Sequence, residues 1–260
     1  MKFLKKSLGQ NFLIDKNIIK KIVNLVGVNN KNIIEIGPGK GALTNEILRR
    51  KPKSLSIIEK DKNLANNLKI SYKKSKNVKV YEEDILKFNI EKIVYEDSII
   101  FGNLPYNISS QILVKLLKFK FWPPKFNNLI LMFQKELGDK IIGKFNTNGY
   151  GRLSILSNYK LKLLKKFFIS PNCFFPRPKV TSVVLHLKPI VNKSFKIKNI
   201  KNLEEVTNIM FSNKRKMIKK NIKKVVNDEE MKTIKDLNLN HRPSEVKPEI
   251  YYKITEFYEK

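Results

Sequence analysis

The sequence predicts an α/β fold with a mostly parallel sheet, followed by a small all-helical domain. Short apolar runs alternate with segments of helical periodicity over the first half of the chain. A glycine-rich turn at residues 37–41 joins the first such run to the helix after it. Beyond residue 200 the apolar positions recur at helical spacing only. Strands that alternate with helices form βαβ units, and ligands of such sheets bind beyond the carboxyl ends of the strands.

The elements can be placed in order along the chain. A first helix is expected at residues 15–26, because Asp15 is a good N-cap and Ile18, Ile22 and Val26 follow at helical spacing. Later apolar runs predict strands, and the periodic segments between them predict helices. The strands are expected at 32–36, 55–59, 78–81, 97–102, 128–133, 161–169 and 181–187, and the helices at 42–50, 62–74 and 111–117.

The chain is expected to divide into two domains. Residues 1–188 hold every predicted strand and form the ligand-binding, catalytic domain, and residues 200–260 form the helical domain after a linker rich in lysine and asparagine. Its helices are expected at 202–211, 214–226, 229–237 and 248–258. The second of these is amphipathic, with Ile218, Ile222 and Val225 on one face and lysines over much of the rest. Such a helix suits contact with the phosphate groups of a polyanion, although a solvated face is the alternative.

Composition narrows the class of protein. The net charge of +30 favours a polyanionic partner, although a bias towards Lys, Asn and Ile of the kind that AT-rich coding DNA produces explains part of it equally well. No apolar run is long enough to span a bilayer, and the start of the chain lacks the pattern of a signal peptide. The single cysteine, Cys173, excludes an intrachain disulfide and a cysteine metal cluster, and His186 and His241 lie far apart in sequence. We therefore expect no metal and a cytoplasmic location.

Features at successive strand ends predict a site for a cofactor with an adenosine group. The glycine turn lets the backbone approach a ligand closely, although it also suits dinucleotide enzymes. Glu59 ends the second strand, where a carboxylate can accept both hydroxyls of a ribose. Asp84 follows the third strand and can accept from the amino group of an adenine. For each residue taken singly there is a structural alternative: a solvated carboxylate at a strand end for Glu59, and a helix N-cap for Asp84.

Asn103-Leu104-Pro105-Tyr106, directly after the fourth strand, is the most informative tetrapeptide. The amino nitrogen of adenine is a poor nucleophile, because its lone pair is delocalised into the ring. An enzyme that methylates it needs acceptors for its N–H bonds, and the Asn103 side chain and the Leu104 carbonyl can supply them. Pro105 fixes the backbone, and Tyr106 offers a flat face for a base taken out of its stack. A simple turn with a core tyrosine is the alternative.

With these motifs the chain resembles the 16S ribosomal RNA adenine dimethyltransferases over essentially its full length. The matching segments follow one another in order along the chain. They are Leu8-Gly9-Gln10-Asn11-Phe12-Leu13, Glu35-Ile36-Gly37-Pro38-Gly39, Ile58-Glu59-Lys60-Asp61, Glu83-Asp84, Gly102-Asn103-Leu104-Pro105-Tyr106-Asn107-Ile108-Ser109, Gln134-Lys135-Glu136, Tyr150-Gly151-Arg152-Leu153-Ser154 and Phe174-Phe175-Pro176-Arg177-Pro178-Lys179-Val180.

The resemblance implies a Rossmann-like class I methyltransferase sheet with S-adenosyl-L-methionine as the methyl donor. It implies that one set of residues lines the donor's pocket: Asn11, Leu13, Gly37, Glu59, Asp84 and Asn103. It also implies that Asn103 and Tyr106 hold the target adenine while Phe174 stacks on its other face; core packing beside Phe175 is the alternative for Phe174. The implied reaction is dimethylation of two adjacent adenosines in the 3′-terminal hairpin of 16S rRNA, by a monomer, during biogenesis of the small ribosomal subunit.

Three other functions compete with this interpretation. One is a large-subunit rRNA adenine methyltransferase of the macrolide-resistance type, although the segments around Asn11 and Asn103 look more like the small-subunit group. Another is a ribosome-assembly factor that acts mainly by binding. The presence of Glu59, Asp84 and Asn103 argues against this function, because a protein that only binds does not need these residues. The last is a nicotinamide-dependent oxidoreductase, which leaves the segment 103–106 without an explanation.

Overall fold

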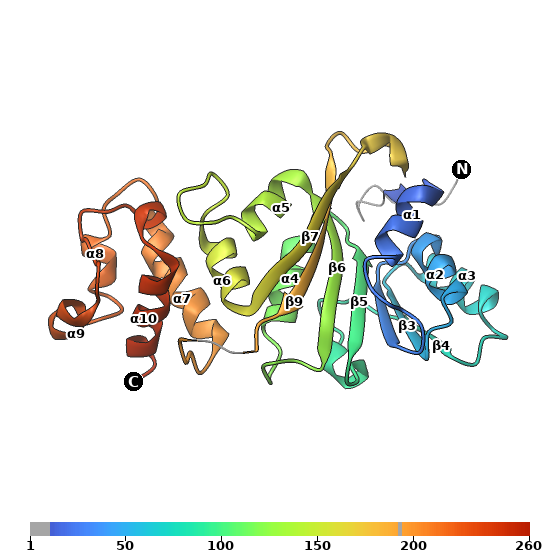
Figure 1. The fold of residues 1–260 in the computed structure, drawn as a ribbon, viewed down its shortest axis with the longest axis horizontal. Helices are drawn as coiled ribbons and strands as arrows, with labels where there is room; N and C mark the ends of the chain where they lie inside the picture. Colours follow the sequence, from blue (N-terminus) through green and yellow to red (C-terminus); the bar gives the residue numbers. More distant parts are fainter. Residues whose placement is uncertain (1–10, 192–193) are drawn as a thin grey trace. The chain divides into compact units, whose positions relative to one another are not determined.

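The computed structural model describes residues 11–191 and 194–260, and these described residues form two compact units (Figure 1). The first unit comprises residues 11–138 and 162–189, and the second comprises residues 139–161 and the described residues from 190 onward. The predicted domains, 1–188 and 200–260, differ from these units in the assignment of residues 139–161. Within the second unit, the Tyr150 hydroxyl donates to the Val246 carbonyl oxygen at 2.7 Å, and the Tyr252 hydroxyl to that of Ile155 at 3.1 Å. Such long-range contacts leave no local pattern in the sequence.

Within the described residues, the first unit is built on one sheet with the strand order β4-β3-β2-β5-β6-β9-β7, which confirms the predicted α/β class. Neighbouring strands run parallel from β4 to β6, and β9 is antiparallel to β6. The chain runs outward from β2 to β4 and then returns to β5, so the strand order reverses between β2 and β5, where open α/β sheets bind ligands. The strands are β2 (Asn32–Ile36), β3 (Ser54–Glu59), β4 (Val78–Glu82), β5 (Ser98–Asn103), β6 (Phe126–Gln134), β7 (Leu161–Ile169) and β9 (Ser182–Pro189).

The predicted helices of the first unit are present in the predicted order, the first before β2 and the others each after a parallel strand. Asp15 caps the first of them as predicted, since its Oδ1 accepts from the backbone N–H groups of Asn17 and Ile18, both at 2.9 Å. Alternate strand residues such as Leu55 and Ile57 share one face of the sheet and join apolar residues of α1, α2 and α3 in a buried core. The helices are α1 (Lys16–Val23), α2 (Ala42–Arg49), α3 (Lys62–Ser71), α4 (Ser109–Leu117) and α5 (Lys135–Ile141), the last of which was not predicted.

The second unit is mostly helical, but its basic segment at residues 214–226 is not the single helix that we predicted. Only α8 (Lys219–Ile222) is α-helical there. Ile218 and Ile222 are fully buried, as the predicted apolar face requires. Lysines three and four residues apart repel one another along a helix, and the Ile218 N–H donates instead to the His241 carbonyl oxygen at 2.9 Å. The other helices are α6 (Arg152–Lys160), α7 (Ile200–Met210), α9 (Asp228–Thr233) and α10 (Pro248–Tyr258).

A short antiparallel ribbon joins two distant segments of the first unit. In it β1 (Phe12–Leu13) pairs with β8 (Phe174–Phe175), so that Phe12 lies opposite Phe175 and Leu13 opposite Phe174. Strands of this length show no alternation, and the sequence did not predict them.

Among the described residues, no helix combines the length and the apolar character needed to cross a membrane.

Candidate active site

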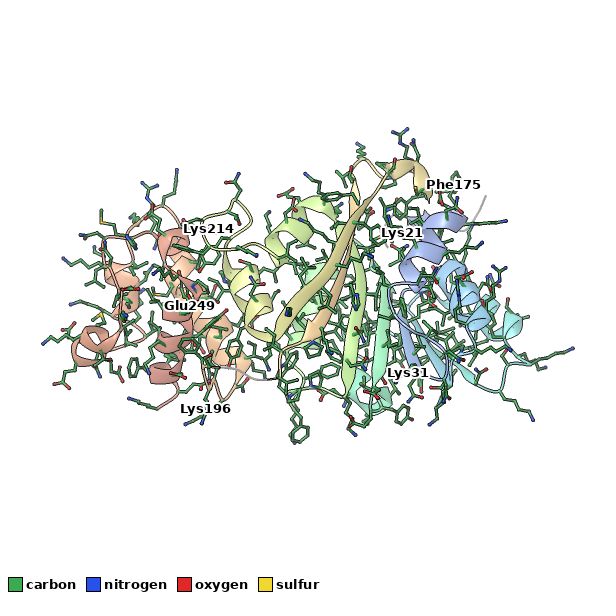
Figure 2. The ribbon with its side chains drawn as sticks, viewed as in Figure 1. Lys21, Lys31, Phe175, Lys196, Lys214 and Glu249 are labelled. Atoms are coloured by element: carbon green, nitrogen blue, oxygen red, sulfur yellow. The ribbon has the colours of Figure 1, made fainter. Side chains whose placement is uncertain are left out.

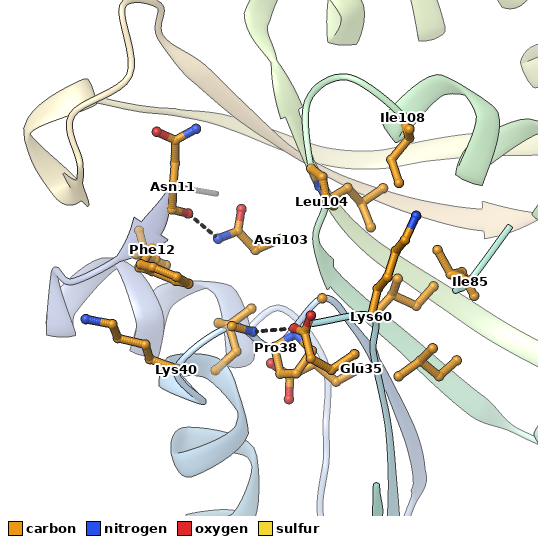
Figure 3. Close-up of a pocket in the computed structure, with 18 of the residues that line it drawn as sticks. Asn11, Phe12, Glu35, Pro38, Lys40, Lys60, Ile85, Asn103, Leu104 and Ile108 are labelled. Atoms are coloured by element: carbon orange, nitrogen blue, oxygen red, sulfur yellow. Dashed lines mark hydrogen bonds between the residues drawn. The ribbon is translucent and has the colours of Figure 1, made fainter. Parts of the chain in front are cut away.

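A cavity of about 170 Å³ opens at the carboxyl ends of β2, β3 and β5, where the strand order reverses (Figure 3). We call it the strand-end cavity. The residues predicted to bind a cofactor all line it: Asn11, Leu13, Gly37, Glu59, Asp84 and Asn103. Leu104, Pro105 and Tyr106 line it as well. The structure therefore brings together side chains that lie far apart in the sequence.

The glycine turn at residues 37–41 forms the floor between β2 and α2. Gly39 has a φ of +59°, and a Cβ atom built there would lie 2.7 Å from the ring of Phe12. Only glycine meets both conditions without strain. The absence of a side chain at this position lets the Phe12 ring lie against the turn, where it becomes part of the cavity wall.

Glu59 is held in place at the end of β3 by backbone groups. Its Oε2 accepts from the N–H of Gly39 at 3.2 Å, and its Oε1 accepts from the N–H of Asp61 at 2.8 Å. The side chain is buried, which raises its pKa. A carboxylate has about four lone-pair sites, so each oxygen retains capacity to accept a further hydrogen bond from a ligand hydroxyl.

Asp84 has a partner that the sequence did not predict. Its Oδ2 lies 2.9 Å from the Lys60 Nζ, and its Oδ1 accepts from the backbone N–H of Leu86 at 2.9 Å. The hydrogen bond from Lys60 lowers the pKa of Asp84, so the carboxylate stays ionised at neutral pH. Figure 3 shows Lys60 extending along the cavity wall towards Ile85 and Ile108. Its aliphatic stem thus adds to an apolar surface, while its ammonium group holds Asp84.

Asn103 is oriented by the backbone of Asn11. The Asn103 Nδ2 donates to the Asn11 carbonyl oxygen at 3.0 Å, across 92 positions of the sequence. Because this contact uses the amide nitrogen, the side-chain oxygen is directed elsewhere, and Figure 3 shows it turned away from the Asn11 contact. The side chain therefore presents an acceptor, which is the group that a donor N–H on a bound base requires.

The hydroxyl of Tyr106 is anchored outside the cavity. It lies 2.6 Å from the Ser182 hydroxyl at the start of β9, and burial raises the pKa of Tyr106, so the ring stays neutral. The Ser109 hydroxyl donates to the Tyr106 carbonyl oxygen at 3.1 Å. Both contacts hold the segment after Asn103 at the cavity, so that the tyrosine contributes a ring of defined orientation.

Phe174 is the one predicted site residue that the structure does not bring to the strand-end cavity. Only 3% of its surface is exposed, and it packs in the core cluster with Leu13, its partner across the β1–β8 ribbon. The neighbouring Phe175 is 45% exposed. The stacking role that we assigned to Phe174 stays a prediction, because in this conformation its ring is covered.

Glu35 lines the cavity and was not among the predicted site residues. It is fully buried in β2, and the Thr44 hydroxyl donates to its Oε2 at 2.6 Å. Burial raises the pKa of Glu35 to about 7. Burial of a carboxyl group among the isoleucines of a strand is costly, so its presence there indicates a function. The single acidic residue in the apolar run at 32–36 is the signal in the sequence that could have revealed Glu35 as a site residue.

Comparison with known proteins adds an independent line of evidence. A family model described as "Ribosomal RNA adenine dimethylase" matches residues 1–260. A protein from Pelagibacter ubique (strain HTCC1062) named "Ribosomal RNA small subunit methyltransferase A" is 46% identical over 98% of this chain and 97% of its own length. A protein of the same name from Mycoplasma mobile is 40% identical over 95% of each chain.

Solved structures share the fold. A dimethyladenosine transferase from Plasmodium falciparum superposes with a TM-score of 0.74 at 23% identity, over 94% of this chain and 95% of that one. The 23S rRNA methyltransferase ErmE superposes with a TM-score of 0.68 at 21% identity, over 96% of this chain and 100% of that one. At these identities the likeness concerns the fold alone, a sheet of the Rossmann-like class I methyltransferase type.

Proposed function

The chain belongs to the ribosomal RNA adenine dimethylase family, and from this membership we propose that it dimethylates two adjacent adenosines in the 3′-terminal hairpin of 16S rRNA. The methyl donor is S-adenosyl-L-methionine, and the acceptor is the exocyclic amino group of each base. Relatives at 40–46% identity that are named for the small ribosomal subunit support this choice of RNA. The 23S rRNA methyltransferase ErmE is 21% identical to this chain, and a likeness at that identity supports the fold and not the substrate.

The observation that carries the proposal is that Asn103, Glu59 and Asp84 line one cavity. The residues present fit the methyl donor. Buried Glu59, with both oxygens already aligned by backbone N–H groups, suits the two hydroxyls of a ribose. Asp84 suits the amino group of the donor's adenine, and Lys60 holds it ionised. When bound, S-adenosyl-L-methionine supplies a methyl group on a positively charged sulfur, a charge that the carboxylates of this cavity favour.

The same residues account for the activation of the base. The Asn103 oxygen accepts one N–H of the adenine amino group, and the Leu104 carbonyl is proposed to accept the other. These two acceptors draw the nitrogen towards pyramidal geometry and so make its lone pair available. Tyr106 supports the ring of the base. No side chain is required to remove a proton before the attack, because the amino nitrogen becomes cationic first and then loses its proton. Positioning supplies most of the rate.

The second methyl transfer makes a further demand on the site. A monomethylated amine has one remaining N–H for the two acceptors, so one of them must face a methyl group. The Leu104 side chain is almost fully buried at the cavity wall. We propose that this apolar wall accepts the first methyl group while Asn103 retains the remaining N–H.

We also propose that the chain acts as a monomer in the cytoplasm, where ribosomal subunits are assembled. The exposed lysines around α8 are proposed to contact RNA phosphates, which position an RNA without reading its sequence. The charge of +30 supports a polyanionic substrate.

Incubation of the protein with labelled S-adenosyl-L-methionine and unmethylated small subunits tests the proposed function. We expect label in two adjacent adenosines of the 3′-terminal hairpin, identified by nuclease mapping and mass spectrometry. Large subunits incubated in parallel serve as the control and should stay unlabelled. Label in large-subunit RNA, or none in either subunit, would contradict the proposal.

A further inference from the structure

Another cavity of the first unit adjoins the strand-end cavity and has no role in the mechanism above. Its volume is about 330 Å³, within the range of roughly 300–1,000 Å³ that is usual for ligand sites. Three residues line both cavities and form the wall between them: Phe12, Gly39 and Lys40. Because it also contains Tyr72 and Phe175, we call it the aromatic cavity.

The β1–β8 ribbon explains how the aromatic rings reach this cavity. Phe12 and Phe175 are opposite partners in an antiparallel pair, so their side chains lie on the same face of the ribbon. The next pair, Leu13 and Phe174, points into the core. Figure 2 shows Phe175 at the surface of the unit, at the opposite end from Lys31, which precedes β2. The ribbon therefore directs one aromatic pair into the cavity and one apolar pair into the protein.

The remaining walls combine an apolar base with a polar rim. Leu64 and Leu68 of α3 are buried and form the base. The rim consists of the exposed side chains of Asn45, Asn67 and Ser71. Amide and hydroxyl groups of this kind can donate to and accept from the edge of a nucleobase, while the aromatic rings offer faces on which the base can stack.

The charge of the aromatic cavity favours an anionic ligand. None of the described residues that line it is acidic, and Lys40 lies at its edge with its Nζ 5.2 Å from the centre of the Phe12 ring. A lysine beside aromatic faces is the combination with which proteins bind single-stranded RNA, the lysine at the phosphate and the rings at the bases.

We propose that the aromatic cavity binds an unpaired nucleotide that flanks the target adenosine, with its base on Phe175 and its phosphate near Lys40. The inference rests on the proposed function, because it takes the RNA as the ligand. The location supports it: Phe12 follows Asn11, whose carbonyl oxygen orients the Asn103 side chain. The cavity thus begins one residue from a contact of the active site, and a nucleotide bound there would hold its neighbour over the strand-end cavity.

The chain offers a matched control for Phe175. Phe121 is 73% exposed and has the Lys120 Nζ 5.4 Å from its ring centre. It lies in the loop before β6, at the amino ends of the parallel strands, whereas the strand-end cavity lies at their carboxyl ends. It therefore reproduces an exposed phenylalanine beside a lysine, away from both cavities. Phe175→Ala, Phe175→Trp and Phe121→Ala can be compared directly, and since both phenylalanines are exposed, none of these variants removes core packing.

The experiment measures the affinity of each variant for a hairpin RNA with the sequence of the 3′-terminal helix of 16S rRNA. We expect Phe175→Ala to weaken binding roughly 5- to 150-fold, the range found when a base-stacking aromatic is replaced by alanine. Phe175→Trp should retain the affinity, Phe121→Ala should leave it unchanged, and none of the three should alter binding of S-adenosyl-L-methionine. Lys40→Gln should reduce the salt dependence of RNA binding by about one phosphate contact.

A crosslinking measurement identifies the occupant. Hairpins with 5-iodouridine at one position beside the methylated adenosines should, on irradiation, crosslink to the peptide that contains Phe175, and Phe175→Ala should abolish this product. Unchanged affinity of Phe175→Ala, or a crosslink only to another peptide, overturns the proposal. Weakened binding of S-adenosyl-L-methionine also overturns it, because the cavity would then belong to the donor site. Failure of the proposed function is distinct, since the wild type would then not methylate small subunits.

Discussion

The two cavities share a wall but differ in charge. The described residues that line the strand-end cavity include four acidic ones: Glu35, Glu59, Glu83 and Asp84. The described residues that line the aromatic cavity include no acidic residue. A methyl donor with a cationic sulfur suits the first, and an RNA phosphate suits the second. One wall of Phe12, Gly39 and Lys40 can therefore separate two ligands of opposite charge.

The cavities also differ in how firmly their polar groups are held. In the strand-end cavity, the Glu59 oxygens and the Asn103 amide are oriented by hydrogen bonds to the backbone. In the aromatic cavity, Asn45 accepts a hydrogen bond from the Tyr72 hydroxyl at 2.9 Å, but Asn67 and Ser71 are exposed at the rim. Oriented groups suit a reaction that depends on geometry, and exposed ones suit a ligand that varies. Substitutions in the strand-end cavity should therefore have the larger effects.

The largest effect is expected for Asn103→Ala, which tests whether the strand-end cavity alone carries the chemistry. The change removes the acceptor for the amino group and should lower kcat roughly 100- to 1,000-fold, as the loss of one oriented catalytic hydrogen-bonding group does. RNA binding, measured by filter retention, should be nearly unchanged. Asn127→Ala is the control, because Asn127 lies at the start of β6 and therefore away from the carboxyl ends of the strands. Full activity of Asn103→Ala would remove the basis for the catalytic assignment.

Glu59→Gln tests whether the carboxylates of the strand-end cavity serve only the methyl donor. Glu59 now accepts hydrogen bonds from two backbone N–H groups. In the glutamine variant the side-chain NH₂ group would face one of these N–H groups, so one charge-assisted hydrogen bond would be lost. We expect binding of S-adenosyl-L-methionine, measured by calorimetry, to weaken roughly 10- to 100-fold, with RNA affinity retained. Glu82→Gln is a close control, because Glu82 is the register partner of Glu59 on β4 and lies outside the cavity. Equal effects of the two changes would contradict the assignment.

Gly39→Ala tests the shared wall. A Cβ atom at a φ of +59° is strained and would press on the Phe12 ring at 2.7 Å. The left-handed conformation costs a non-glycine residue about 1–2 kcal/mol of folding stability. Because the Phe12 ring lines both cavities, its displacement should also weaken the binding of both ligands, each by about tenfold. Gly27→Ala is the control, since a Cβ atom there meets nothing within 4 Å. Loss of only one of the two affinities would show that the wall does not couple the cavities.

Glu35→Gln should change how donor affinity depends on pH. Burial raises the pKa of Glu35 to about 7, so the folded protein holds it neutral below that pH and charged above it. The cationic donor favours the charged form. The wild type should therefore bind the donor more tightly as the pH rises from 6 to 8, by up to about tenfold over that whole range, because the charged fraction of Glu35 rises from about 0.1 to about 0.9. In Glu35→Gln this component is absent, and titration of the donor's own groups is common to both proteins. Parallel pH profiles would contradict the assignment.

The smallest effect is expected for Lys60→Met. The change removes the ion pair with Asp84 but keeps an apolar stem along the cavity wall. Because 55% of the Lys60 side chain is exposed, the pair is screened by water, and we expect donor affinity to fall by no more than about fivefold. Lys69→Met, which breaks the ion pair with Glu82 outside the cavity, should have no effect on the donor. A loss greater than that of Glu59→Gln would mean that Lys60 contacts the donor itself.

The sequence by itself determined the strands, the glycine turn and the residues that end the strands. Apolar runs in β2, β3 and β5 and the cap at Asp15 are local features, and neighbouring parallel strands necessarily bring Glu59, Asp84 and Asn103 to one edge. The site residues on these elements could therefore be predicted without coordinates.

Tertiary structure decided the rest. It determined that Lys60 holds Asp84, that Asn11 orients Asn103, and that the β1–β8 ribbon exposes Phe175 while it buries Phe174. It also divided the basic segment around α8 and joined residues 139–161 to the helical unit. The physical reason is that periodicity records the environment of each residue along its own helix or strand, whereas the partner of a charged or aromatic side chain depends on contacts between segments that are distant in the chain.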